Sequence, residues 1–254
     1  MTIVLEVSGL KKSFGGVAAV KGVDFSVAAG EAVALIGPNG AGKTTTFNLI
    51  NGQIKPDAGR VALHGADITG RVPEHLFRLG VARTFQITAT FASMTVRENV
   101  QMALLSYERG AHSVVKRAAY ECLRQADALL ADIGLAEQGA RAAAELAYGD
   151  LKRLELAMAL ANHPRLLLMD EPTAGMAPAE RELLMQLAVK TCRERNVALL
   201  FTEHDMDVVF GFADRVIVMN RGRIIAQGSP EEVRGNVEVR AVYLGGVTED
   251  KAHA

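Results

Sequence analysis

Residues 37–45 of this chain read Gly37-Pro38-Asn39-Gly40-Ala41-Gly42-Lys43-Thr44-Thr45. They match the pattern G-x-x-x-x-G-K-[ST], a loop that cradles phosphate groups. The apolar run before the loop, Ala32–Ile36, is short and bounded by glycines, which predicts a buried parallel strand. The residues that follow, Lys43–Asn51, predict a helix that ends at Gly52. A glycine-rich loop between a strand and a helix predicts a nucleotide-binding site.

The residue types of the loop suit phosphate chemistry. Glycines let backbone N–H groups curl around an anion, and the N-terminus of the following helix adds partial positive charge. Lys43 is expected to reach the β- and γ-phosphates, and the Thr44 hydroxyl is expected to bind Mg²⁺. The predicted nucleotide-binding residues of the loop are Asn39, Gly40, Ala41, Gly42, Lys43, Thr44 and Thr45.

Composition narrows the class of protein. The chain has 254 residues, of which 49% are hydrophobic and 22% are charged, as in ordinary globular proteins. Its net charge of −1 argues against a general nucleic-acid-binding protein, which is usually basic. No apolar run approaches the roughly 18 residues that cross a membrane, and no signal peptide is evident. The two cysteines, Cys122 and Cys192, lie far apart, which predicts buried side chains in a reducing, cytoplasmic compartment.

Hydrophobic periodicity divides the rest of the chain. Short alternating segments near the loop predict an antiparallel sheet; they are Ile3–Val7, Val17–Val20, Val23–Val27 and Arg60–Ile68. From about Thr95 to Leu160 the spacing of apolar residues is helical, most clearly over Lys116–Ile133. Further on, the expected elements are strands at Leu166–Asp170 and Ala198–Thr202, a helix at Ala179–Arg195, a hairpin of Val216–Met219 with Arg223–Ala226, and a helix starting at Ser229.

These patterns predict an α/β fold. We expect a P-loop NTPase (RecA-like) core with an antiparallel β subdomain and an inserted α-helical subdomain. One domain would span residues 1–254. Residues 1–86 and 164–254 would form the core and the β subdomain, and residues 87–163 would form the helical subdomain.

Two carboxylates follow a later strand. The apolar run Leu166–Met169 ends in Asp170 and Glu171, so both acids are expected at the edge of the sheet where α/β folds bind ligands. Asp170 suits the ligand shell of Mg²⁺. Glu171 is one residue further on and can hold and polarise a water molecule, which makes it the candidate general base.

The phosphate loop, the helical insert and Asp170-Glu171-Pro172, in this order, resemble the ATP-binding cassette (ABC) ATPase family. The resemblance implies ATP as the nucleotide. It also implies that Phe14 stacks on adenine, that Gln86 contacts Mg²⁺ and the attacking water, and that His204 contacts the γ-phosphate. The implied catalytic residues are then Lys43, Gln86, Glu171 and His204, and the implied Mg²⁺ ligands are Thr44, Gln86 and Asp170.

The signature motif of the family, usually Leu-Ser-Gly-Gly-Gln before a helix, corresponds to Leu146-Ala147-Tyr148-Gly149-Asp150. In the family this motif completes the ATP site of the opposite subunit in a head-to-tail dimer, which implies that Tyr148 and Gly149 contact the nucleotide. Two residues depart from the family pattern. Ala147 replaces the serine, and Ala177 stands where an aspartate commonly links the two sites. Their effect on hydrolysis stays open.

Several further stretches are similar to the ATPases of branched-chain amino-acid importers; they are Phe14–Val20, Val81–Gln86, Met94–Val100 and Val239–Gly245. This subgroup implies ATP-driven import of branched-chain or related amino acids. It implies three kinds of partner: a second ATPase chain, identical or homologous; two transmembrane permease subunits; and, indirectly, a solute-binding protein. Nucleic acid is not expected as a partner. The chain would lie peripherally on the cytoplasmic face of the inner membrane.

Alternative functions remain open on the sequence. One is a stand-alone or regulatory ABC ATPase that is not coupled to transport, and another is an ABC ATPase for a different solute such as urea, amides or lipopolysaccharide. Stand-alone members often carry two cassettes or basic inserts, whereas this chain has one cassette and a net charge of −1. The presence of Glu171 and His204 counts against a purely regulatory role. The base-reading motif Asn-Lys-x-Asp, which would indicate a small GTPase, does not occur.

Overall fold

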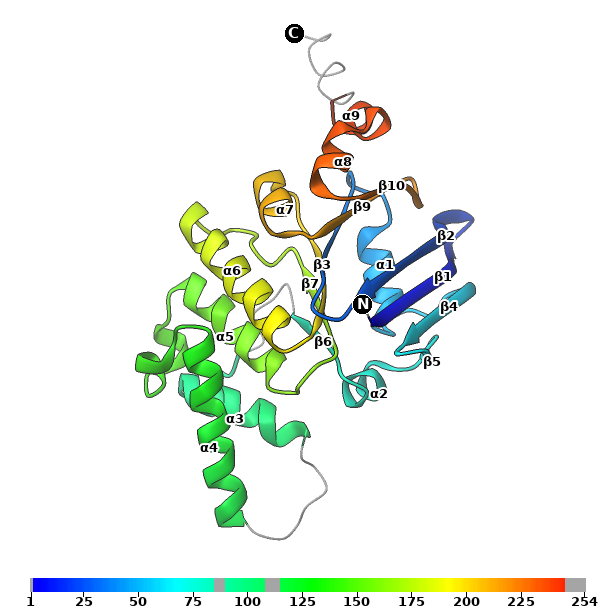
Figure 1. Ribbon diagram of the computed structural model, residues 1–254. Coiled ribbons are helices and arrows are strands. Elements are labelled where there is room, and N and C mark those ends of the chain that lie inside the picture. Colours follow the sequence, from blue (N-terminus) through cyan, green and yellow to red (C-terminus); the bar gives the residue numbers. More distant parts are fainter. Residues whose placement is uncertain (1, 85–89, 108–114, 245–254) are drawn as a thin grey trace.

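The computed structural model describes residues 2–84, 90–107 and 115–244 (Figure 1). In these residues a six-stranded sheet has the order β10-β9-β3-β8-β7-β6, in which all neighbours are parallel except the pair β9 and β10. Its strands are β3 (Ala32–Ile36), β6 (Val81–Thr84), β7 (Leu166–Asp170), β8 (Ala198–Thr202), β9 (Arg215–Asn220) and β10 (Arg223–Gly228). The strands predicted at β3, β7 and β8 are confirmed at both ends.

The central strands are buried on both faces because different layers cover them. Every residue of β3, β7 and β8 is buried. Alternate side chains point to opposite sides of a pleated sheet, so Leu167 and Phe201 join one buried cluster with the helices, whereas Leu168 and Leu200 join another with the antiparallel sheet. Burying one such side chain contributes about 1.5–3 kcal/mol to folding.

The second sheet of the described chain is antiparallel and has the order β2-β1-β4-β5. Its strands are β1 (Ile3–Phe14), β2 (Val17–Ala28), β4 (Ala58–Leu63) and β5 (Ala66–Asp67). The three short strands that the sequence predicted before residue 30 are in fact two long ones. The register of β1 against β2 shifts between Val7 and Leu10 and again at Lys11. These irregularities interrupt the alternation of apolar residues, so the pattern indicated separate pieces.

Helices surround the two sheets in Figure 1. They are α1 (Lys43–Ile50), α2 (Pro73–Arg78), α3 (Val96–Tyr107), α4 (Val115–Asp132), α5 (Tyr148–Leu160), α6 (Pro178–Glu194), α7 (Met206–Phe212), α8 (Pro230–Gly235) and α9 (Val237–Leu244), with short 3₁₀ turns at Ala136–Gln138 and Ala143–Glu145. The helices predicted near α1, α4 and α6 are present to within a few residues. In the described part of the chain, none of these helices has the length and apolar content to span a bilayer.

The helices α3, α4 and α5 gather at one end of the molecule (Figure 1). Their buried side chains belong to the same cluster as those of α6 and one face of the sheet, with Leu104 from α3, Leu130 from α4 and Leu156 from α5 among its members. The division into residues 87–163 and the remainder therefore stays a prediction, because packing is continuous across it.

The two cysteines were expected to be buried. Cys122 and Cys192 are both buried, and burial raises the pKa of the Cys192 thiol to about 12.

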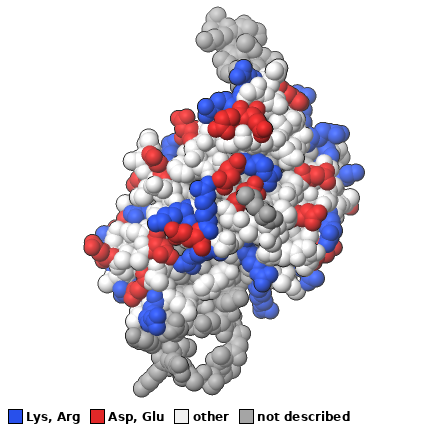
Figure 2. All heavy atoms as spheres, viewed as in Figure 1, with Lys and Arg blue, Asp and Glu red and all other residues white. Residues whose placement is uncertain are grey.

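The surface charges are mixed in sign. On the face shown in Figure 2, the Lys and Arg side chains are interspersed with those of Asp and Glu. Opposite charges that alternate in this way partly cancel at a distance.

Gly59 is a position where the antiparallel sheet depends on the absence of a side chain. Its φ is +92°, and a Cβ there would lie 2.4 Å from the carbonyl oxygen of Gly9. We expect Gly59→Ala to lower the free energy of unfolding by about 3 kcal/mol, because a left-handed backbone and a backbone clash add. The matched control is Gly235→Ala, where nothing lies within 4 Å of the added Cβ. Urea denaturation of both variants checks this, and equal stability would contradict it.

Candidate functional site

The phosphate loop links the buried strand β3 to helix α1, and close packing requires its glycines. A Cβ at Gly37 would lie 2.2 Å from the carbonyl oxygen of Met219, and a Cβ at Gly42 would lie 2.5 Å from that of Ala19. Among the described residues, no side chain caps the N-terminus of α1. The first N–H groups of this helix are therefore directed at the loop, where an anion would receive them.

Lys43 lies inside the loop and has an exposed fraction of 7%. Its Nζ donates to the carbonyl oxygens of Gly37, at 2.6 Å, and of Pro38, at 3.2 Å. Burial lowers the pKa of the Lys43 ammonium, while the carboxylates of Glu171 and Asp170 act in the opposite direction. The influence of both acids on Lys43 indicates that the loop and the end of β7 form one site.

Asp170 ends β7 and is held on both carboxylate oxygens. Oδ1 accepts a hydrogen bond from Thr202 Oγ1 at 2.7 Å, and Oδ2 accepts one from the Arg83 guanidinium at 2.8 Å. Arg83 also donates to Asn48 Oδ1 on α1, at 2.7 Å. The buried carboxylate is therefore fixed in orientation, because one oxygen has a guanidinium donor and the other has a hydroxyl donor.

Glu171 follows Asp170 with an unusual backbone. Its φ is +49°, in the left-handed region, and its N–H donates to both the carbonyl and the hydroxyl of Thr202, each at 3.1 Å. His204 Nε2 lies 2.7 Å from Glu171 Oε1. A carboxylate can only accept in such a bond, so a hydrogen bond between these two atoms requires the imidazole proton on Nε2. The pair brings a carboxylate and an imidazole together beyond the ends of β7 and β8.

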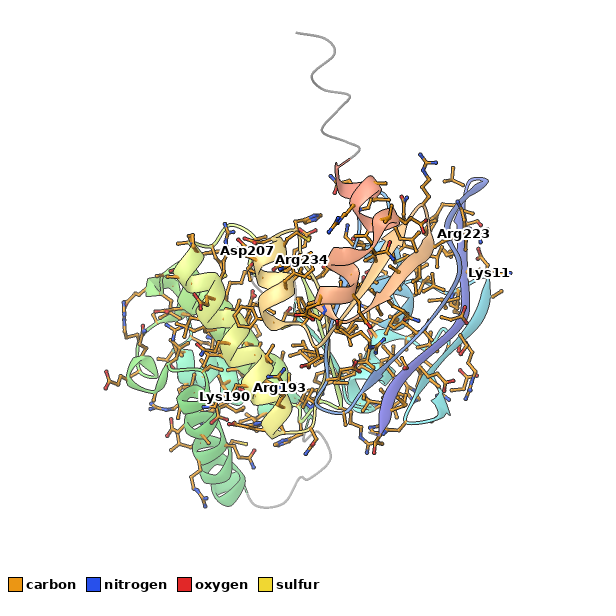
Figure 3. The ribbon with its side chains drawn as sticks, turned by 45° about the horizontal axis from the view of Figure 1, so that its top comes forward. Lys11, Lys190, Arg193, Asp207, Arg223 and Arg234 are labelled. Atoms are coloured by element: carbon orange, nitrogen blue, oxygen red, sulfur yellow. The ribbon has the colours of Figure 1, made fainter. Side chains whose placement is uncertain are left out.

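A buried acid that sequence reasoning missed orders the loop after Glu171. Glu203 has an exposed fraction of 4%, and its Oε1 accepts from both the N–H and the hydroxyl of Thr173, at 2.9 and 2.7 Å. Two residues further on, Asp205 caps α7 by accepting from the N–H of Asp207, at 3.0 Å (Asp207 is labelled in Figure 3). These contacts fix the backbone on both sides of His204.

The signature segment starts helix α5, and it contacts the loop after β7. The Tyr148 hydroxyl donates to the carbonyl oxygen of Ala174 at 3.2 Å, and a Cβ at Gly149 would lie 2.7 Å from Glu180 Oε1. Lys152 Nζ lies 5.6 Å from the centroid of the Tyr148 ring, within reach of a cation–π interaction. Tyr148 is exposed in this chain, with an exposed fraction of 44%.

The site residues predicted from the sequence fall into three groups in the structure. Four of them lie together: Lys43, Asp170, Glu171 and His204. Phe14 ends β1 at the tip of the β1–β2 hairpin with an exposed fraction of 47%, and its role in stacking stays a prediction. Gln86 lies outside the described residues.

Thr202, Arg83 and Glu203 are the residues at the site that sequence reasoning missed. Thr202 is the register partner of Asp170 across β8 and β7, and Arg83 lies on β6, the neighbour of β7. A polar residue at the end of an apolar strand was the available signal for Thr202 and Glu203, as it was for Asp170. Their partners depend on strand order, which a single sequence does not provide.

A glycine-rich phosphate loop between β3 and α1, with a carboxylate–imidazole pair beyond the adjacent strands, defines a P-loop ATPase of α/β fold. The family model described as "ABC transporter" matches residues 20–174, and the one described as "Branched-chain amino acid ATP-binding cassette transporter" matches residues 223–248. The chain belongs to the ABC transporter family, as one of its nucleotide-binding ATPases.

Individual proteins are similar over nearly the whole chain. The high-affinity branched-chain amino acid transport ATP-binding protein LivG of Escherichia coli K12 is 41% identical over 95% of this chain and 98% of its own. A crystal structure of an ATP-binding cassette of an ABC transporter in its ADP conformation is 31% identical, with a TM-score of 0.84 over 96% of this chain and all of the other. A dimeric cassette bound to ADP and Pi is 27% identical, with a TM-score of 0.74 over 89% of this chain and 98% of its own.

Substitution of Thr202 tests whether its hydroxyl is needed at the site, because that hydroxyl bonds both the Asp170 carboxylate and the backbone N–H of Glu171. We expect Thr202→Val to lower the rate of ATP hydrolysis by at least about tenfold, because both groups lose a hydrogen bond that fixes them. Thr202→Ser keeps the hydroxyl and is the matched control, with a rate near that of the original chain. Steady-state phosphate release measures both, and equal rates for Val and Ser would count against the bridge.

Proposed function

We propose that this chain is the ATP-hydrolysing subunit of a membrane transporter that imports branched-chain or related amino acids. The observation that carries the proposal is the convergence of Lys43, Asp170, Glu171 and His204 at the edge where the parallel strands end. The names of the similar proteins and the match over residues 223–248 support the choice of solute.

In the proposed reaction each side chain has a distinct task. The Lys43 ammonium leaves its carbonyl partners to stabilise charge on the β- and γ-phosphates. The Glu171 carboxylate takes a proton from the attacking water, and the His204 Nε2–H holds that carboxylate in orientation. We assign Gln86 to the positioning of the same water. Phe14 would stack on adenine, and the main chain from Asn39 to Thr45 would hold the phosphates.

The residues of the site suit Mg²⁺. Asp170 presents a carboxyl group at the end of β7, and Thr44 presents a hydroxyl at the start of α1, so the donors are oxygen atoms, which Mg²⁺ prefers. Gln86 would be a third ligand. When bound, Mg²⁺ would neutralise charge that develops on the phosphates.

Three kinds of partner are proposed. A second ATPase chain, identical or homologous, would pair head to tail so that Tyr148 and Gly149 of one chain face the ATP of the other; a dimeric cassette among the similar structures supports a pair of such chains. Of two permease subunits, one would contact this chain at the apolar groove lined by Phe77 of α2, Arg83 of β6 and Met102 of α3. A solute-binding protein would act on the permease from the other side of the membrane. The chain would then lie on the cytoplasmic face of the inner membrane.

Affinity capture tests the transporter directly. The tagged chain is purified from detergent-solubilised membranes of its host, and the proteins that accompany it are identified. We expect two polytopic membrane proteins, with or without a second ATPase. Capture of ribosomes or DNA without membrane subunits would overturn the transporter and favour a stand-alone ATPase.

The role of Glu171 gives a second prediction. We expect Glu171→Gln to bind MgATP normally but to hydrolyse it at least about 100-fold more slowly, because an amide cannot take the proton of water. The variant should then accumulate as a dimer in MgATP, which size-exclusion chromatography with light scattering detects. Glu182→Gln, an exposed change on α6, is the control. Normal turnover of Glu171→Gln would remove Glu171 as the base.

A further inference from the structure

His204 is flanked in the chain by two acids, and both are tied to the loop that follows β7. Glu203, on its N-terminal side, accepts from the N–H and the hydroxyl of Thr173, at 2.9 and 2.7 Å. The other carboxylate oxygen of Glu203 accepts from the N–H of His204 itself, at 3.2 Å. Asp205, on the C-terminal side, reaches the same loop through an arginine, so His204 is held from both sides.

Arg181, near the start of α6, makes the contact with Asp205. Its Nη1 donates to Asp205 Oδ2 at 2.6 Å, and its Nε donates to the carbonyl oxygen of Met176 at 2.7 Å. The guanidinium is planar and rigid, so it fixes the separation of the two groups that it binds. One side chain therefore joins the loop after β7 to the start of α7.

The two carboxylate oxygens of Asp205 have different partners. Oδ1 accepts from the backbone N–H groups of Asp207 and Val208 and so caps α7, whereas Oδ2 is bound by Arg181. The cap fixes Asp205 to the helix, and Arg181 fixes the capped helix to the loop. Because His204 directly precedes Asp205, the placement of its backbone relative to the loop depends on this link.

The loop that Arg181 binds begins at Glu171. The N–H of Ala174 donates to the carbonyl oxygen of Glu171 at 3.2 Å, which folds the start of the loop into a tight turn. Met176, two residues further on, supplies the carbonyl that Arg181 binds. Arg181 thus connects the segment that carries Glu171 with the segment that carries His204, whose side chains lie 2.7 Å apart.

We infer that Arg181 is a positioning residue for ATP hydrolysis, which keeps His204 against Glu171 by binding Asp205 and the carbonyl of Met176 at the same time. It acts through these two segments rather than on the nucleotide. The inference rests on the proposed function, because the roles of Glu171 and His204 in hydrolysis come from there.

Two single variants break the link from opposite sides. Arg181→Gln removes the charged fork of donors. Asp205→Asn removes the carboxylate that Arg181 binds but keeps an oxygen for the cap of α7, because asparagine caps a helix about as well as aspartate. The side chains of Arg181 and Asp205 are 32% and 31% exposed, and ion pairs at such positions add little to stability. Both variants should therefore fold with a Tm near that of the original chain.

We expect each single variant to lower kcat about tenfold, because a small displacement of His204 from Glu171 is costly to the chemical step. The KM for MgATP should be unchanged, because the phosphate loop at residues 37–45 is intact. The double variant should be no slower than the slower single variant, since both changes break one contact, whereas independent effects would multiply to about 100-fold. Steady-state phosphate release measures the rates, on each tagged chain purified with the partners that it captures.

The matched control is Arg193→Gln, which breaks a different Arg–Asp pair of α6, that with Asp214. Arg193 lies at the other end of this helix, about 18 Å from Arg181 at 1.5 Å per residue (Figure 3). Its kcat and KM should equal those of the original chain. A purely structural role of Arg181 would instead lower the Tm and leave the kcat of the folded variant unchanged.

The outcomes are distinguishable. If either folded single variant keeps the original kcat, or if the two losses multiply in the double variant, the inference is overturned while the proposed function stands. If the original chain with its captured partners hydrolyses no ATP, the proposed function is overturned as well. A lower kcat at unchanged KM in both single variants, with no further loss in the double variant and a normal control, supports the inference. If one single variant does not fold, the other decides by its kcat.

Discussion

The hydrogen-bonded register of the parallel strands is the constraint on which the site depends. β3, β7 and β8 are buried along their whole length, so the first polar side chains after each strand are brought to the same edge of the sheet. There the register places Asp170 opposite Thr202, and one hydroxyl joins that carboxylate to the backbone of Glu171. A slip of one residue would turn Asp170 to the other face of the sheet and break this link.

The sequence predicts those parts of the molecule whose signals are local. The loop at residues 37–45, the strand ending in Asp170 and the helices near α1 and α6 each follow from short patterns. Contacts between distant segments are different in kind: Arg83 reaches Asp170 because β6 lies beside β7, and Glu203 reaches Thr173 because β8 lies beside β7 on the other side. The long strands β1 and β2 were predicted as shorter pieces because bulges break the alternation on which a strand is identified.

Helix α5 contributes residues to two surfaces, the signature segment at its first turn and the apolar groove further along. Its first residues form the signature segment and contact the loop after β7, while Glu155, about 10 Å along the axis at 1.5 Å per residue, lines the apolar groove. Between them, Lys152 contacts both Tyr148 and Glu155. The buried side chains of α5, Leu154 and Leu156 among them, belong to the cluster that the helices share with one face of the six-stranded sheet.

The left-handed backbone of Glu171 has an evolutionary consequence. At φ +49° a residue with a Cβ costs the fold about 1 kcal/mol or more, which glycine would avoid. Stability and chemistry therefore select different residues at this position. A laboratory evolution experiment that rewards heat resistance alone would enrich replacements that relax the turn and discard the carboxylate. Under the role proposed for Glu171, the need for ATP hydrolysis in the host is the selection that would retain its carboxylate.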